Sequence, residues 1–254
     1  MLLTIDVGNT MTDFGLFKAD QTPLFYRIRS RADLSAEEAI ASFSVFLQSK
    51  AIAPSSFSGA ILSSVVPALT ELYLKVCRTL LGLEPKVVGP GLKTGLKIVT
   101  DNPKEVGADM IAAAIGAKVL YGAPCIVADF GTANKVFLLD PSGAFVGCTI
   151  GAGIGLQVNS LSQNAALLPE VSPSIPAKIL GKNTVDCMNS ALTYGNAFMI
   201  RSLVEGIEKE AGYPCKKVLT GGFAETVKDL LPEFTYEPHL VLQGLLDIYR
   251  RNAQ

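Results

Sequence analysis

The sequence predicts an α/β fold made of two similar halves, and three observations support this prediction. First, a run of apolar residues ends in an Asp-x-Gly turn followed by a second strand, once at Asp6-Val7-Gly8 and again at Asp129-Phe130-Gly131. Second, segments typical of strands alternate with segments typical of helices in each half. Third, the 254 residues, 49% hydrophobic and 18% charged, can bury one large core or two modest ones. We place the boundary between residues 117 and 118, which gives domains 1–117 and 118–254.

The first half begins with an antiparallel meander, and the turn between its second and third strands is expected at residues 18–23. Ser35, followed by Glu37 and Glu38, is a helix start signal, and Pro67 opens a second helix. The predicted strands cover residues 2–6, 13–18, 24–30, 59–65 and 86–88, and the predicted helices cover 36–49, 68–81 and 110–120. A Gly- and Pro-rich loop at 89–95 and turn residues at 101–109 precede the last of these helices.

The second half starts with the second hairpin, whose strands cover residues 125–128 and 135–139. An uncharged stretch follows from Pro141 to Pro169, and its apolar part is shorter than the ~20 residues that a membrane-spanning helix needs. We interpret it as a buried Gly-rich turn leading into a helix, with no membrane contact. The remaining predicted elements are helices at 155–168, 184–211, 224–231 and 240–250, a polar loop at 169–183 and a strand at 217–220.

Charge and cysteine content exclude several classes of protein. The net charge is −1 and the basic residues are scattered, so the basic patch expected of a nucleic-acid-binding protein is absent. Five widely spaced cysteines without a Cys-x-x-Cys pair favour a reduced cytoplasmic protein over a zinc or disulfide framework. His239 is the only histidine, which leaves little support for a histidine triad or zinc site. Asp6 interrupts the N-terminal apolar run, which indicates a first strand and not a signal peptide.

The two Asp-x-Gly turns are candidates for a nucleotide site. The first reads Asp6-x-Gly8-Asn9-Thr10-x-Thr12, with a carboxylate, an amide and two hydroxyls within seven residues. Such groups can hold a metal ion and phosphate oxygens, although an ordinary hairpin turn uses the same residue types. The second copy, at Asp129 and Thr132, favours the nucleotide interpretation, with the two hairpins facing each other across it. Phosphoryl transfer is therefore the leading hypothesis.

Two further segments carry candidate site residues. Thr220-Gly221-Gly222 ends a strand and opens a helix, so its backbone amides could face a nucleotide. Asp109 follows Gly107-Ala108 at the start of a helix of small residues. It could deprotonate a substrate hydroxyl as a general base, or it could simply cap the helix. Spacing alone favours the cap.

Several segments along nearly the whole chain, taken together, resemble the type III pantothenate kinases, members of the acetate and sugar kinase, heat-shock protein and actin superfamily. The most specific is the string Asp101-Asn102-Pro103-Lys104-Glu105-Val106-Gly107-Ala108-Asp109. The others are residues 5–10, 63–67, 88–96, 129–133, 168–169, 181–184 and 220–222.

The resemblance implies a fold and an activity. The fold would consist of two duplicated actin-like (ribonuclease H-like) domains with mixed sheets and a nucleotide cleft between them. The activity would be transfer of the ATP γ-phosphate to pantothenate, giving 4'-phosphopantothenate in the first step of coenzyme A synthesis. Mg²⁺ and a monovalent cation, K⁺ or NH₄⁺, would assist, and the protein would be a cytoplasmic homodimer.

The resemblance also implies roles for individual residues. Asp109 would be the general base, which overrides the helix-cap interpretation. Asp129 would bind the monovalent cation, and Asp6 would lie by the divalent metal, through phosphate or water. The phosphate contacts would be Asp6, Gly8, Asn9, Thr10, Thr12, Thr132, Gly221 and Gly222. The pantothenate site would comprise Thr100, Gly107, Ala108, Met110 and Thr184, with Thr184 reaching across the dimer.

The chain departs from the family pattern mainly on the acceptor side. Met110 stands where the family has Arg, and Thr100 stands where it has Tyr. Asn134 replaces a Thr in the second hairpin, and Ala152-Gly153 replaces Pro-Gly. Losing the Arg removes a charged donor that Met cannot replace. A kinase for another small hydroxyl compound, or a weak paralogue with a regulatory or binding role, are therefore alternatives; retention of three carboxylates, Asp6, Asp109 and Asp129, favours an enzyme.

Overall fold

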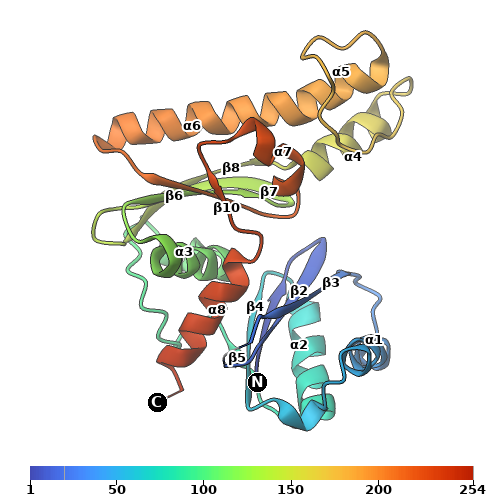
Figure 1. Cartoon of the computed structure of the whole chain (residues 1–254), viewed down its shortest axis with the longest axis vertical. Coiled ribbons are helices and arrows are strands. Elements are labelled where there is room, and N and C mark those ends of the chain that lie inside the picture. The colour runs from blue at the N-terminus through green and yellow to red at the C-terminus, as the bar shows by residue number, and fades with distance from the viewer. Residues whose placement is uncertain (20, 254) are drawn as a thin grey trace. The chain divides into compact units, whose positions relative to one another are not determined.

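The computed structural model describes residues 1–19 and 21–253, which form two compact units (Figure 1). Unit 1 contains Met1–Leu96, Asn102–Val119 and Leu240–Gln254, and unit 2 contains Lys97–Asp101 and Leu120–His239. The expected turn at residues 18–23 includes Asp20, which lies outside the described residues. The boundary that we place between the two duplicated domains, at residues 117 and 118, stays a prediction.

Unit 1 contains a five-stranded mixed sheet in the order β3-β2-β1-β4-β5. Its strands are β1 (Leu2–Val7), β2 (Met11–Phe17), β3 (Leu24–Arg29), β4 (Gly59–Ser64) and β5 (Lys86–Val87). β1, β2 and β3 form the predicted antiparallel meander, and β4 and β5 add to β1 in parallel. The antiparallel meander predicted for the first half is confirmed.

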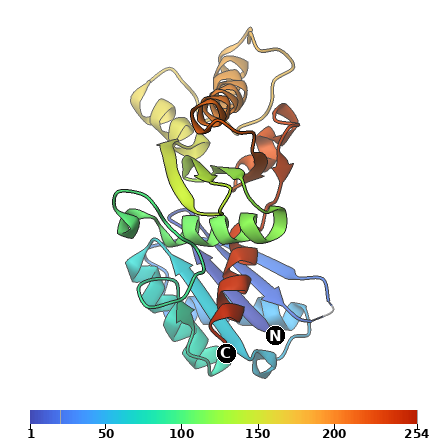
Figure 2. The same cartoon turned by 90° about the vertical axis from the view of Figure 1, so that its left-hand side faces the viewer.

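Helices cover both faces of this sheet, as Figures 1 and 2 show. On one face Ile5 and Phe14 pack against α1 (Ala36–Ser49) and α2 (Pro67–Val76). On the other face Phe17 and Ile61 belong to one core cluster with α8 (Leu240–Arg251), which contacts β1, β2 and β4, and with α3 (Ala108–Tyr121), which packs against α8. α1 begins as predicted: Ser35 Oγ accepts from the Glu38 backbone N–H at 3.1 Å, and the Glu38 carboxylate accepts from the Ser35 N–H at 2.9 Å.

Unit 2 repeats the same strand arrangement in a sheet ordered β10-β9-β6-β7-β8. Its strands are β6 (Cys125–Phe130), β7 (Ala133–Leu139), β8 (Phe145–Ala152), β9 (Lys216–Thr220) and β10 (Thr235–Tyr236). Again the first three strands form an antiparallel meander, and the last two add in parallel. The predicted α/β fold with duplicated halves and mixed sheets is therefore confirmed.

One face of the unit 2 sheet is covered by helices. Ile126 and Ala128 of β6 pack against Ile200 and Val204 of the long helix α6, which Figure 1 shows lying along the sheet. The helices of this unit are α4 (Ile154–Asn164), α5 (Thr184–Ser190), α6 (Asn196–Ala211) and α7 (Ala224–Val227). None of the helices over the described residues has both the length and the hydropathy of a membrane-spanning segment.

Some predicted elements of unit 2 differ from the structure. The prediction of a buried Gly-rich turn is wrong, because residues 145–152 form the strand β8 at the edge of the sheet. β8 pairs with β7 alone, and the second half of the strand is largely exposed. The helix predicted over 184–211 is split into α5 and α6 by a π-helical turn at Ala191–Gly195. α4 ends at Asn164, and α7 is a single turn followed by a 3₁₀ turn at Lys228–Leu230. The two-residue strand β10 was not predicted.

Two differences in unit 1 concern short helical turns. α2 ends at Val76 and continues as a π-helical turn over Cys77–Leu81, where the sequence predicts an uninterrupted helix. The loop before α3 contains a 3₁₀ turn at Pro103–Glu105, and another lies at Pro54–Ser56. Asn102 accepts from the Lys104 N–H at 3.3 Å and so begins the 3₁₀ turn at Pro103.

Candidate active site

Asp6 lies at the carboxyl end of β1, in the middle of the unit 1 sheet. Its cross-strand neighbours are Asp13 of β2 and Ser63 of β4, and the Ser63 hydroxyl donates to Asp6 Oδ1. The neighbouring Asp13 carboxylate is paired with Arg27 Nε at 2.5 Å. Because residues in one cross-strand row share a face, Asp6 lies on the face that α3 and α8 cover.

The turn after Asp6 brings some of the predicted phosphate contacts to the surface. The Gly8 N–H donates to the Met11 carbonyl at 3.0 Å and closes the turn, which leaves Asn9 and Thr10 exposed. Thr12 is fully buried on the opposite face of the sheet from Asp6, and its hydroxyl lies 2.9 Å from Ser30 Oγ. Asn9 and Thr10 are thus accessible to a ligand as they stand, whereas a phosphate contact by Thr12 stays a prediction.

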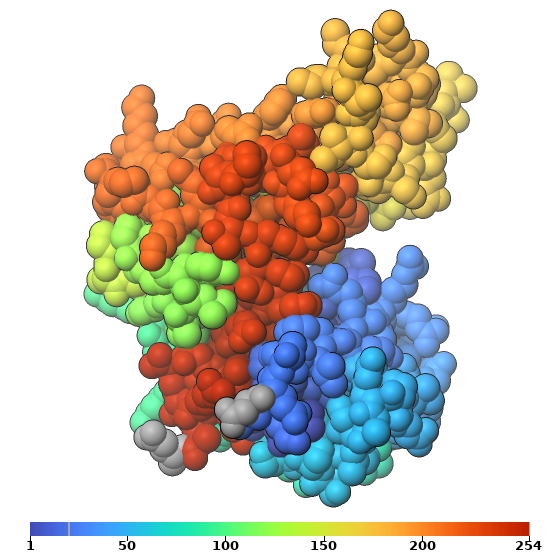
Figure 3. Space-filling model, viewed as in Figure 1, coloured from blue at the N-terminus to red at the C-terminus, as the bar shows by residue number. Residues whose placement is uncertain are grey.

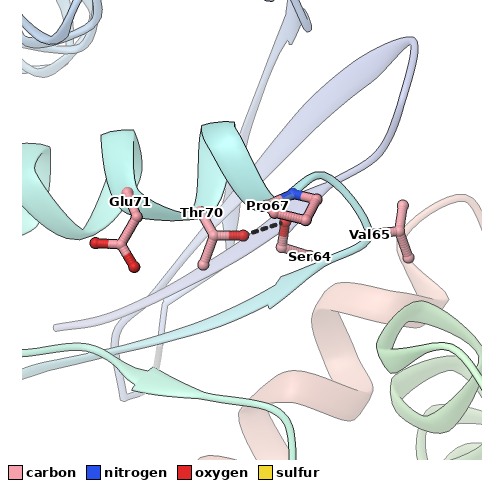
Figure 4. A pocket seen from close by; sticks show the side chains of 5 residues that line it. All are labelled: Ser64, Val65, Pro67, Thr70 and Glu71. Carbon is pink, nitrogen blue, oxygen red and sulfur yellow. Dashed lines mark hydrogen bonds between the residues drawn. The ribbon is translucent and has the colours of Figure 1, made fainter.

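A shallow pocket of about 330 Å³ lies at the adjacent end of β4 (Figure 4). Its position beside the first turn follows from the strand register, which pairs Val7 with Ser64, and from the Val65 N–H, which donates to the Val7 carbonyl at 3.1 Å. Thr70 of α2 donates to Ser64 Oγ at 2.7 Å. The pocket is lined by Ser64, Val65, Pro67, Thr70 and Glu71.

Asp109 lies in the first turn of α3, which packs against α8, the helix that covers the Asp6 face of the sheet. α3, which contains Asp109, and the Asp6 side chain are therefore on the same side of the unit 1 sheet. Asp109 Oδ1 accepts from the Met110 N–H at 2.8 Å, a contact to the next residue and not to the second or third residue that a helix cap engages. A Cβ at Gly107 would lie 2.5 Å from Asp109 Oδ1, so a side chain there would displace the carboxylate. The roles of cap and base both stay predictions.

The acceptor-side departures occupy buried or partly buried positions. Met110 is 7% exposed, which is the burial of a core side chain. In unit 2, Thr100 Oγ1 is a buried hydroxyl without a hydrogen-bond partner in the structure. A buried polar atom of this kind costs free energy unless a ligand or water supplies the partner. Thr184, the first residue of α5, is exposed.

Asp129 lies at the end of β6, in unit 2, between two glycine-containing turns. A Cβ at Gly221 would lie 2.4 Å from Asp129 Oδ1, and one at Gly131 would lie 3.3 Å from it. Gly221 also has φ +99°, which side chains rarely adopt. The predicted phosphate-side residues Gly221 and Thr132 thus belong to the two turns that flank this carboxylate, with Gly222 exposed next to Gly221.

The second oxygen of Asp129 is engaged by a lysine. Asp129 and Lys135 are cross-strand partners on β6 and β7, and Lys135 Nζ lies 2.8 Å from Asp129 Oδ2. Both side chains are well buried, at 15% and 14% exposure for the lysine and the aspartate. At an effective dielectric constant of about 20, a second unit charge about 4 Å from this ammonium group would be repelled by roughly 4 kcal/mol, which offsets the attraction of the Asp129 carboxylate at a similar distance. Because Lys135 already neutralises Asp129, the pair offers an additional monovalent cation no net attraction.

A divalent ion fits the first turn better. Mg²⁺ is usually held by one or two carboxylates together with substrate phosphates and water. Asp6 supplies one carboxylate at the end of β1, beside the exposed turn residues. Among the described residues no group of three or more acidic, histidine or cysteine side chains is gathered in one place.

The sequence reasoning missed a buried amide network in unit 2. Asn134 Nδ2 donates to Asn196 Oδ1 at 2.7 Å, and Asn196 Nδ2 donates to Gln157 Oε1 at 2.9 Å. Gln157 Nε2 in turn donates to the Ala152 carbonyl at 2.8 Å. Asn134 thus connects β7 to α4 and α6, which accounts for its departure from the family's Thr. No local pattern could reveal this network, because its members are up to 62 residues apart.

Comparison of sequences identifies relatives of this chain. The family described as type III pantothenate kinase matches residues 2–206. A type III pantothenate kinase from Dehalococcoides mccartyi (strain ATCC BAA-2266 / KCTC 15142 / 195) is 36% identical over 252 residues, which cover 99% of this chain and 98% of the relative. The similarity therefore extends over both units and not over a single motif.

Comparison of structures shows the same fold in more distant proteins. A Campylobacter jejuni protein described as a conserved candidate transcriptional activator of the Baf family has a TM-score of 0.60 at 20% identity, with 99% and 98% of the two chains covered. A candidate 2-dehydro-3-deoxygalactonokinase from Sinorhizobium meliloti has a TM-score of 0.56 at 13% identity, with 99% and 96% covered. At these identities the likeness concerns the fold alone.

Proposed function

This chain belongs to the type III pantothenate kinase family, and on that premise we propose that it transfers the γ-phosphoryl group of ATP to the hydroxyl of pantothenate. The product would be 4'-phosphopantothenate, for coenzyme A synthesis. The observation that carries the proposal is the presence of Asp6 and Asp109 on the same side of the unit 1 sheet, in a chain related over its full length to kinases of that name.

In the proposed reaction Asp109 removes the proton of the acceptor hydroxyl as its oxygen attacks the γ-phosphorus. Backbone N–H groups and hydroxyls of the two turns stabilise the charge that develops on the phosphoryl oxygens. Asp6 is the carboxylate that would hold a divalent ion bound with ATP, and that ion would neutralise phosphate charge. The phosphate contacts would be Gly8, Asn9, Thr10 and Thr12 in unit 1 and Thr132, Gly221 and Gly222 in unit 2.

Thr100, Gly107, Ala108 and Met110 form the proposed acceptor side. The unpartnered Thr100 hydroxyl supports this assignment, since a polar group of the acceptor would satisfy it. Gly107 supports it as well, because it allows the Asp109 carboxylate to approach the backbone.

We further propose a homodimer in which Thr184 contributes to the partner's acceptor site. Exposed apolar side chains are concentrated between residues 150 and 199, in and around the α4–α5 segment that stands out from unit 2 in Figure 3. Leu167 is 94% exposed and Leu180 is 85% exposed, and surfaces of this kind mark protein contacts. We place the protein in the cytoplasm, where its five free thiols would stay reduced.

A second candidate is a kinase for a different hydroxylated acceptor. The observation that favours it is Met110, which is buried and uncharged where the family has Arg. A coupled ATPase assay over a panel of hydroxyl compounds, with pantothenate first, separates the two candidates. Turnover with none of them would favour a regulatory or binding role.

The Asp109→Asn variant tests the proposed base. Asn keeps an oxygen that can accept from the Met110 N–H, so the helix start is preserved while the base is removed. Turnover with pantothenate should fall by roughly 10²- to 10⁴-fold, the usual worth of a positioned base. ATP binding, measured by calorimetry, should be retained.

The matched control is Asp229→Asn, which removes an exposed carboxylate from the 3₁₀ turn after α7. Its turnover should equal that of the wild type. Near-normal turnover of Asp109→Asn would instead show that Asp109 only begins the helix.

A further inference from the structure

The ion pair between Asp129 and Lys135 is unusual for its burial and its position. Lys135 Nζ lies 2.8 Å from Asp129 Oδ2, and the two side chains are 15% and 14% exposed. The Lys217–Glu208 pair of the same unit is more exposed, at 25% and 18%, with an N–O distance of 3.0 Å. A lysine is held in such a place only when its charge is compensated, and Asp129 supplies that compensation.

The surroundings fix this carboxylate against both proposed phosphate-side turns of unit 2. A Cβ at Gly221 would lie 2.4 Å from Asp129 Oδ1 and would overlap it, and a Cβ at Gly131 would lie 3.3 Å away, a tight contact. The neighbouring residue Thr220 is the cross-strand partner of Asp129 on β9 and is 2% exposed. The Lys135 ammonium group is therefore tied to the base of the turns that contain Thr132, Gly221 and Gly222.

The field of Lys135 extends to the next strand. Cys148 of β8 faces Phe137, two residues along β7 from Lys135. Burial raises the pKa of the Cys148 thiol, and the nearby Lys135 charge opposes that rise.

We propose that the Lys135 ammonium group takes the place of the monovalent cation that the family resemblance leads one to expect at Asp129. Both are single positive charges beside the same carboxylate, but the lysine is tethered and needs no binding from solution. ATP binding and turnover are then independent of potassium and ammonium. This inference rests on the proposed function for the identity of the nucleotide, and Lys135 acts as a positioning residue, through Asp129 and its turns.

The test compares ATP affinity in potassium chloride and in tetramethylammonium chloride of equal ionic strength, by calorimetry without acceptor. Wild-type affinity should be the same in both salts. Lys135→Met keeps the aliphatic stem and removes the ammonium group, so its ATP affinity in tetramethylammonium should fall roughly tenfold or more, the loss expected for one charged hydrogen-bonded partner. Potassium or ammonium chloride should restore affinity, because the vacated position can accept a small ion.

Three further variants complete the design. Lys135→Ala leaves more room for the ion and should also be rescued by potassium. Lys135→Arg keeps the charge and should remain independent of the salt. Lys217→Met removes the comparison ion pair of unit 2 and should bind ATP as the wild type does in both salts.

A potassium requirement in the wild type would overturn the proposal. So would Lys135→Met and Lys135→Ala variants that fold, as judged by circular dichroism, and show no rescue by potassium. Pantothenate turnover is measured separately in the same salts. Its absence would contradict the proposed function, whereas the ATP-binding comparison would still decide the role of Lys135.

Discussion

At the scale of single residues, Met110 is the departure with the clearest chemical consequence. It is 7% exposed and follows Asp109 in the first turn of α3, where the family has an Arg. A buried thioether cannot pair with the carboxylate of pantothenate. Thr100, the second departure, leaves an unpartnered hydroxyl in place of an aromatic ring.

We expect the double variant Met110→Arg with Thr100→Tyr to bind pantothenate more tightly. A charge-assisted hydrogen bond to a carboxylate is worth about 1.5–3 kcal/mol, which corresponds to roughly 10- to 150-fold in affinity. The measurement is the pantothenate KM of the double variant beside that of the wild type. A wild type that already binds as tightly would indicate that Lys97 or Lys104 supplies the contact.

The control for added charge is Val45→Arg, at a valine of α1 that is 65% exposed. It should leave the KM unchanged. Because an arginine at the buried position 110 has no partner in the free enzyme, the double variant should also gain thermal stability from pantothenate. The absence of that gain would argue against a carboxylate contact at this position.

Residue types around the two turns could be predicted from the sequence, but their partners could not. The repeated Asp-x-Gly pattern identified Asp6 and Asp129 as strand-end carboxylates, because turn chemistry is local. The bonds of Asn134 to Asn196, and of Ser63 to Asp6, join residues 62 and 57 positions apart. Only the packed sheet and helices decide such pairs.

At the scale of elements, α3 and α8 cross at small residues. A Cβ at Gly244 of α8 would lie 1.8 Å from the Ala112 carbonyl of α3, and one at Gly116 would lie 2.3 Å from the Leu240 carbonyl. The two helix backbones therefore touch, which lets both helices cover the Asp6 face of the unit 1 sheet.

Gly244→Ala should destabilise the protein by about 1–3 kcal/mol, the usual cost of overpacking a core. Gly206→Ala, in the interior of α6, is the matched change, since nothing lies within 4 Å of its Cβ position. It should stabilise by about 0.5–1 kcal/mol, because alanine favours the helix. Urea unfolding measures both, and equal effects of the two changes would contradict the close crossing of α3 and α8.

Element types were largely predictable, whereas some ends and interruptions were not. Apolar runs on both sides of the two Asp-x-Gly turns predict the first meander and the second hairpin, because buried strands and tight turns are local features. The edge strand β8 escapes this signal, since all but its first residue are exposed or partly exposed and it contains Gly147 and Gly151. The π-helical turn at Ala191–Gly195 also lacks a local signal, because apolar spacing continues through it.

At the scale of the whole molecule, stability should fall at alkaline pH. Burial raises the pKa of the Cys77 and Cys125 thiols from 9.0 to about 12. At pH values between 9.0 and about 12 the unfolded chain releases thiol protons that the folded chain keeps. The free energy of unfolding therefore falls as the pH rises through this range. Each thiol should contribute about 1.4 kcal/mol per pH unit in this range.

Urea unfolding at about pH 8 and about pH 10 measures this dependence. The variant with Cys77→Ala and Cys125→Ala should lose less stability between the two pH values than the wild type. Cys187→Ala, which removes an exposed thiol, is the control and should behave as the wild type. An unchanged dependence in the double variant would contradict the role of the two buried thiols.

The return of α8 to unit 1 has a consequence for how the protein is made. One face of the N-terminal sheet is covered partly by residues 240–251, which leave the ribosome after all of unit 2 has been synthesised. Until then Ile61 and Phe17 lack the apolar partners that α8 supplies in the finished chain. Unit 2 is continuous from Leu120 to His239 apart from residues 97–101 and can be completed first. The half of the protein that begins the chain is thus the last to be finished, and nascent chains stalled before residue 240 would expose that face to chaperones.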